Sequence, residues 1–147
     1  MSRRTWYPDA QWTSQGLTHV LFSFLTNDTS DPATTGFRGC GGLTGSDGAT
    51  SVANTGPSAI ASITRSGVGA YLVTFADGYR YATAKFATIE DAADALHARV
   101  GAVANEGSGA TTACTMAVVV RSAATATEST GRRVSCYVAF KDSGNGT

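Results

Sequence analysis

The sequence has few of the charged residues on which nucleic-acid binding depends. Only 15% of the 147 residues are charged, and equal numbers of acidic and basic side chains give a formal net charge of zero. Neutralising phosphates requires clustered Lys and Arg, so this balance argues against a general nucleic-acid-binding protein. A free monomer with so few surface charges would also have low solubility. We therefore expect partner proteins to cover much of the surface.

Histidine and cysteine are scarce as well. The two histidines, His19 and His97, have no partners at the spacing of metal ligands, and no CxxC pair occurs. The odd number of cysteines (Cys40, Cys114 and Cys136) does not indicate a disulfide framework. We expect these cysteines to be small buried apolar residues. The sequence therefore predicts neither a metal site nor a cofactor.

Catalytic motifs and membrane-spanning segments are also missing from the sequence. Ser46 and Ser58 lack the Gly-x-Ser-x-Gly frame of a nucleophile elbow. The glycine-rich stretch 39–45 lacks the spacing of a dinucleotide-binding loop, and no helical pattern follows it. No apolar run approaches the roughly 18 residues of a membrane span, and the start of the chain resembles a signal peptide only weakly. We expect a protein without enzymatic activity that is made and folded in the cytoplasm.

What the sequence does contain is a series of short segments with the alternation of β-strands. The clearest are residues 17–26, 59–64, 70–76, 79–88, 114–121 and 133–141. Two weaker candidates, 34–38 and 50–54, fall within the long polar stretch 27–57. A tight connection is predicted at residues 66–69, and Asp77-Gly78 predicts a hairpin between the strands on either side. The fold expected is mainly β, an antiparallel sandwich or barrel of jelly-roll type.

One segment has a helical period instead. Five apolar side chains fall on one helical face, and Gly101 stands where a C-cap glycine would. They are Ile89, Ala92, Ala93, Leu96 and Val100. We therefore predict one short α-helix over residues 89–100, with His97 in its last turn.

The first 16 residues differ from the rest of the chain. They contain both tryptophans and no clear periodicity. Aromatic residues and arginine dominate the energy of protein interfaces, so we predict an N-terminal arm (1–16) that binds a partner. The candidate partner-binding residues are Arg3, Arg4, Trp6, Tyr7 and Trp12. The arm would precede a β-rich domain (17–143) and a flexible tail (144–147). The alternative is that these aromatic side chains pack on their own subunit.

The centre of the chain carries a pattern of turns and alternating residues. An apolar strand leads into an Arg-x-Gly-x-Gly turn and an aromatic-led alternating strand, then an Asp before a Tyr-containing strand. These positions are Arg65, Gly67, Gly69, Tyr71, Val73, Phe75, Asp77 and Tyr79. A Val-Gly-x-Val element follows at 100–103, and a turn with a final strand occupies 126–140. Over roughly residues 17–143, the sequence resembles small structural proteins of tailed bacteriophages.

The resemblance implies a virion protein of the cement or decoration type. Such a protein would bind the outside of an icosahedral phage head and stabilise contacts between capsomers. Its partners would be the major capsid protein and itself, as a homotrimer, with neither nucleic acid nor a membrane as a partner. Closed symmetry is the rule for such assemblies, and a trimer suits threefold positions of a shell.

Two other functions are compatible with the sequence. The chain could be another virion component, such as a minor head, tail or fibre-base subunit. It could also be a β-barrel that binds a small ligand or carbohydrate, with tyrosines lining an apolar cavity. Those tyrosines would be Tyr71, Tyr79, Tyr81 and Tyr137.

Overall fold

The structure is a computed structural model, and it describes residues 11–14, 17–33, 37, 60–76, 78–79, 81–90, 95–106, 113–123, 125–127 and 129–141. These residues form nine strands and no helix. The strands are β1 (Gln11–Ser14), β2 (Leu17–Leu25), β3 (Ile60–Gly67), β4 (Ala70–Phe75), β5 (Tyr81–Ile89), β6 (Leu96–Ala104), β7 (Thr115–Ser122), β8 (Thr125–Ala126) and β9 (Arg133–Lys141).

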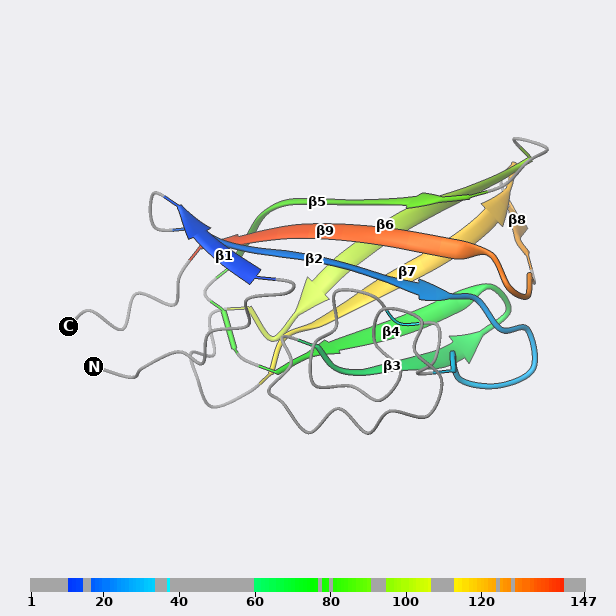
Figure 1. Ribbon diagram of the computed structural model, residues 1–147, viewed down its shortest axis with the longest axis horizontal. Coiled ribbons are helices and arrows are strands. Elements are labelled where there is room, and N and C mark those ends of the chain that lie inside the picture. Colours follow the sequence, from blue (N-terminus) through cyan, green and yellow to red (C-terminus); the bar gives the residue numbers. More distant parts are fainter. Residues whose placement is uncertain are drawn as a thin grey trace.

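The strands make two antiparallel sheets that pack on each other (Figure 1). Sheet A has the order β1-β2-β9-β5, and sheet B has the order β3-β4-β7-β6, with β8 paired to β7. β2 and β9 pair along their whole lengths, from Leu17 opposite Lys141 to Leu25 opposite Arg133. The prediction of a mainly β, antiparallel sandwich is confirmed.

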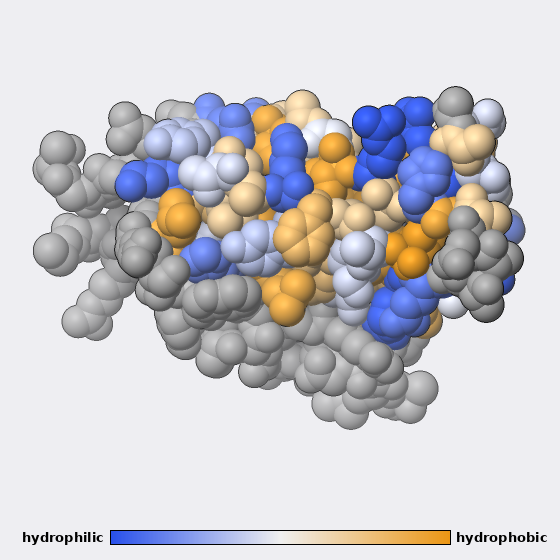
Figure 2. All heavy atoms as spheres, turned by 90° about the horizontal axis from the view of Figure 1, so that it is seen from above, coloured by the Kyte–Doolittle hydropathy of each residue, from blue (hydrophilic) through white to orange (hydrophobic). Residues whose placement is uncertain are grey.

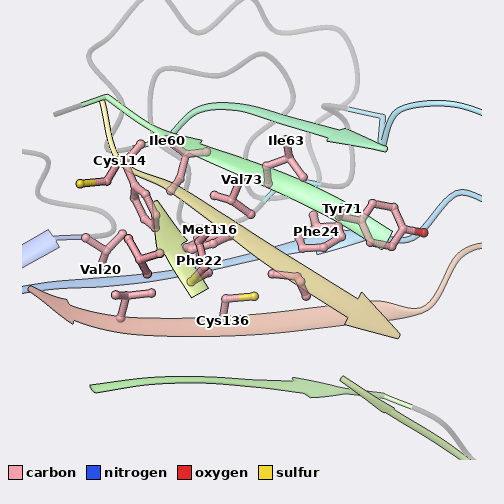
Figure 3. Packing of buried hydrophobic residues seen from close by; sticks show 14 of the residues in the cluster. Val20, Phe22, Phe24, Ile60, Ile63, Tyr71, Val73, Cys114, Met116 and Cys136 are labelled. Carbon is pink, nitrogen blue, oxygen red and sulfur yellow. The ribbon is translucent and has the colours of Figure 1, made fainter. Parts of the chain in front are cut away.

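The core lies between the two sheets and follows from the alternation of the strands (Figure 3). Every second residue of β2, β4, β7 and β9 is buried, because successive side chains of a strand point to opposite faces. Aromatic rings fill one part of this core. Phe140 stacks on Tyr79 with ring centroids 4.1 Å apart, and Phe75 meets Phe140 edge to face at 4.9 Å. All three side chains are fully buried.

The six clear strand predictions correspond to β2, β3, β4, β5, β7 and β9, within a few residues at their ends. The tight connection at 66–69 is also confirmed, since β3 and β4 pair as a hairpin across it. Of the two weaker candidates, only Phe37 is described by the structure. It is buried in the core and belongs to no strand.

The hairpin predicted at Asp77-Gly78 is wrong. β4 lies in sheet B between β3 and β7, whereas β5 lies in sheet A beside β9. Tyr79 provides the physical reason, because its ring is buried against Phe140 and its N–H donates to Cys114 Sγ at 3.2 Å. Burying this side chain takes the chain from one sheet to the other. The turn preference of Asp-Gly is local and does not determine which strand comes next in the sheet.

The helix predicted over residues 89–100 is also wrong in the residues that the structure describes. Ile89 ends β5, and Leu96–Ala104 forms β6, which pairs with β7 from Leu96 opposite Ser122 onward. Residues 91–94 lie outside the described residues. Leu96, Ala98 and Val100 pack partly against the core, alternating with the exposed His97 and Arg99. Alanine at several positions is compatible with both the helical and the strand period. Pairing with β7, which is rich in β-branched residues, favours the strand.

Candidate partner-binding surface

The outer face of sheet A carries a row of large apolar side chains that crosses three strands. Leu21 of β2 pairs with Tyr137 of β9, which in turn pairs with Phe86 of β5. Leu21 is 49% exposed and Phe86 is 56% exposed, whereas Tyr137 is half-buried between them. We call these three residues the apolar row. Exposed side chains of this size, in one line on a rigid sheet, are typical of a surface that binds another protein.

The register of the strands explains why the row exists. The neighbours of Leu21 and Tyr137 along their strands, such as Phe22 and Cys136, are buried between the sheets, and Phe86 is paired directly with Tyr137. Leu21, Tyr137 and Phe86 must therefore point outward, because side chains alternate along a strand. Directly paired residues have their Cβ atoms about 4.5–5.5 Å apart. The Tyr137 and Phe86 rings are in contact, with centroids 5.1 Å apart.

Polar contacts hold the residues beside the row. His19 Nδ1 and the Tyr137 hydroxyl are joined by a hydrogen bond of 2.7 Å, and their ring centroids lie 6.0 Å apart. Arg133 Nη1 donates to Ser23 Oγ at 2.9 Å. These bonds join β2 to β9 on the outer face. They reduce the side-chain freedom that a binding partner would otherwise have to restrict.

Figure 2 shows the molecule from above the view of Figure 1, on the side along which β5 runs. Hydrophobic atoms there are exposed between hydrophilic ones over the middle of the face. Tyr81, 43% exposed, lies further along β5, where it pairs with Lys141. The charged Lys141 and Arg133 stand at the two ends of β9. The face therefore has an apolar centre with basic groups at both ends of its middle strand.

The outer face of sheet B differs from that of sheet A. Leu72, 37% exposed, is the large hydrophobic side chain that β4 places there. A shallow cavity of about 270 Å³ lies on the same sheet, where β6 shifts register between Val100 and Val103. It is lined by Arg99, Val100, Gly101, Val119 and Arg121. Its two guanidinium groups give this cavity a basic character.

Most of the predicted partner-binding residues are not described by the structure. Arg3, Arg4, Trp6 and Tyr7 lie outside the described residues. Trp12 lies in β1, the edge strand of sheet A, where its Cα is paired with that of His19. Residues 11–14 of the predicted arm thus form a strand of the sheet that carries the apolar row. The prediction that the arm binds a partner stays a prediction.

Sequence reasoning missed the apolar row, although part of its signal was present. In residues 17–26 the alternation already places Leu21 on the face opposite Val20 and Phe22. A single apolar residue on the outward face of a strand is ordinary, and only a contiguous group of them indicates a covered surface. Phe86 and Tyr137 could not be joined to Leu21 without the pairing of β2, β9 and β5.

The four tyrosines of the ligand-binding alternative do not come together around one cavity. Tyr71 and Tyr79 are buried in the core, where Tyr71 packs on Phe24 and its hydroxyl donates to the carbonyl oxygen of Asn27 at 3.0 Å. Tyr81 and Tyr137 lie on sheet A, on strands β5 and β9, with part of each side chain exposed. This arrangement gives the ligand-binding alternative no support.

Metal-binding clusters and membrane-spanning helices are both missing from the described residues. No three His, Cys, Asp or Glu side chains in this part of the chain come close enough to hold a metal ion. No helix long and apolar enough to cross a membrane occurs among the same residues. Comparison of the chain with protein-family models, curated proteins and solved structures gave no match.

Proposed function

We propose that the chain is a structural subunit of a tailed-phage virion, a cement or decoration protein that binds the outside of the icosahedral head. The observation that carries this proposal is the apolar row on the outer face of sheet A. A cement protein needs a rigid scaffold and a surface that fits its neighbours, and it needs no reactive groups. The pattern of turns around Arg65, Gly67 and Gly69 supports the same class of protein through its resemblance to phage structural proteins.

In this proposal the outer face of sheet A contacts the major capsid protein. Leu21 and Phe86 are each about half exposed, and fully burying a side chain of this size contributes about 1.5–3 kcal/mol. Completing the burial of either one would thus contribute about 1 kcal/mol. The basic groups of Arg133 and Lys141 would meet carboxylates at the edge of the contact, where charges affect specificity and association rate. The chain would act as a homotrimer, with each copy presenting this face to the shell.

The test is co-sedimentation of the purified protein with phage heads that lack it. We expect the protein to sediment with the heads, and Leu21→Ser and Phe86→Ser each to weaken binding about five- to tenfold, since about 1.4 kcal/mol corresponds to tenfold. Leu72→Ser is the matched control, because Leu72 is also an exposed apolar residue but belongs to the opposite sheet. Failure of the unaltered protein to sediment with heads contradicts the proposed function. Equal weakening by Leu72→Ser contradicts the choice of face.

A further inference from the structure

β5 has the properties of an edge strand that can accept another strand. It is nine residues long and, among the described residues, forms backbone pairs only with β9, while β6 of the other sheet also lies near it. Proteins commonly protect such edges with charges, prolines or bulges. β5 has no proline, one charged residue (Lys85) and one register shift, between Ala82 and Ala84. Glu106 Oε1 accepts the N–H of Ala82 at 2.7 Å, so a side chain occupies this one backbone group at the start of the strand.

The backbone groups available at this edge can be identified from the hydrogen bonds to β9. The N–H of Glu90 donates to the carbonyl oxygen of Arg133 at 2.8 Å, in the same register as the β5–β9 pairs. Hydrogen-bonded and non-hydrogen-bonded pairs alternate in an antiparallel ladder. Thr88, Phe86 and Ala84 therefore bond to β9, and the N–H and C=O groups of Lys85, Ala87 and Ile89 point away from it.

We propose that two copies of this chain pair through this edge, antiparallel, about a twofold axis at Phe86. In this register Phe86 lies opposite Phe86 of the second copy, and Ala84 lies opposite Thr88. Lys85 pairs with Ala87 of the second copy, and Ala87 with Lys85, so the outward N–H and C=O groups of both residues are satisfied. Sheet A of one copy then continues into sheet A of the other.

Three features of the strand favour a second copy as the occupant. An antiparallel edge is complementary to itself about a twofold axis, because the same groups on both copies serve as donors and acceptors. The register places the one charge of β5, Lys85, opposite Ala87 rather than opposite its own copy, and a chain of zero net charge is not repelled by itself. Phe86 would meet its counterpart at a non-hydrogen-bonded pair, where side chains approach most closely.

The same register joins the two apolar rows end to end. The row in each copy runs from Leu21 through Tyr137 to Phe86 at the edge. Pairing at Phe86 makes one continuous line of apolar side chains across both copies. A twofold contact cannot by itself close a trimer, so this contact is separate from the proposed homotrimer and does not rest on the capsid function.

Disulfide trapping tests both the contact and its register. In a Cys40→Ser background, whose two other cysteines are buried, Phe86→Cys should cross-link to a dimer under mild copper–phenanthroline oxidation. Paired residues at non-hydrogen-bonded positions lie within the Cα distance that a disulfide bridges. Thr88→Cys is the matched control, on the same face of the same strand. Its two copies would lie four residues apart along the strands, about 13 Å, which is beyond disulfide reach.

We expect Phe86→Cys to cross-link at least about tenfold faster than Thr88→Cys, given this difference in separation. The double variant Ala84→Cys/Thr88→Cys should also cross-link rapidly, because these two positions oppose each other in the proposed register. This double variant keeps the test valid if replacing Phe86 itself weakens the contact. If neither Phe86→Cys nor the double variant cross-links faster than Thr88→Cys, the contact is wrong. If Thr88→Cys cross-links rapidly and the other two variants do not, the proposed register, with Phe86 opposite Phe86, is wrong.

Discussion

Replacing Gly69 by alanine tests the way in which the β3–β4 turn packs on β7 and β8. Gly69 has a φ of 57°, and its carbonyl oxygen accepts the N–H of Val120 at 2.8 Å. Thr127 in turn donates its N–H to the carbonyl oxygen of Val120 at 3.0 Å. The turn is thus held against the backbone at the end of β7, at a point where no side chain is present.

The expected cost of Gly69→Ala has two parts. A left-handed conformation costs a residue with a Cβ roughly 1–2 kcal/mol. A Cβ at Gly69 would also lie 2.8 Å from the carbonyl oxygen of Val120 and would clash with that of Thr127. Both are backbone atoms that cannot rotate away, and overpacking of this kind costs about 1–3 kcal/mol. We therefore expect the free energy of unfolding to fall by about 2–5 kcal/mol.

Substitutions at two other glycines measure the cost of the left-handed conformation and the cost of the clash separately. Gly131 has a φ of 74° but nothing within 4 Å of its virtual Cβ, so Gly131→Ala should lose only about 1–2 kcal/mol. Gly67 has neither a positive φ nor a close neighbour, so Gly67→Ala should change stability by at most about 0.5 kcal/mol or raise it slightly. The assay is urea unfolding followed by circular dichroism, with unchanged m-values. If Gly69→Ala is no more destabilising than Gly131→Ala, the packing of this turn on Val120 and Thr127 is wrong.

Three further predictions concern the core and the N-terminus. Phe140→Ala should lower the free energy of unfolding by about 3–5 kcal/mol, because it removes a fully buried ring that stacks on Tyr79. A loss below about 1 kcal/mol in urea unfolding would contradict the packing of Phe140 in the core. Tyr71→Phe should lower the free energy of unfolding by about 1–2 kcal/mol in the same assay, since the Tyr71 hydroxyl forms hydrogen bonds with both the N–H and the C=O of Asn27. An unchanged urea midpoint would argue against those hydrogen bonds. Deletion of residues 1–16 also removes the edge strand β1 and should leave most of the β signal intact but weaken head binding or trimer stability. Outright unfolding of the truncated protein would assign the arm to the core, and an unchanged truncated protein would disprove the binding role.

Local patterns in the sequence predicted six of the nine described strands, because burial alternates with the period that a strand imposes. Val20, Phe22 and Phe24 in β2, and Tyr71, Val73 and Phe75 in β4, could be assigned to one buried face from their alternation alone. Pairing between strands that are distant in the sequence could not be predicted in this way, since it depends on contacts between distant segments. Asp77-Gly78 suggested a local hairpin, but burial of Tyr79 takes the chain across to sheet A.

The candidate surface was harder to predict than the fold, because it also depends on pairing between distant strands. Its residues come from β2, β5 and β9 and form a row only through the register of those strands. The error over residues 89–100 has a different origin. Alanines fit a helical face and a strand face equally well, so the pattern around Ala98 carried little information. The β-branched side chains of β7, on which β6 pairs, decide in favour of the strand.

The most direct test of the proposed function is to measure the amount of this protein in purified virions of a tailed phage whose genome carries its gene. Quantitative mass spectrometry of virions, with the major capsid protein as the internal standard, gives the copy number. A cement or decoration protein should be present in hundreds of copies, in a fixed ratio to the capsid protein. A handful of copies would place the chain in the tail or connector. Absence of the protein from purified virions would contradict a structural role in the particle.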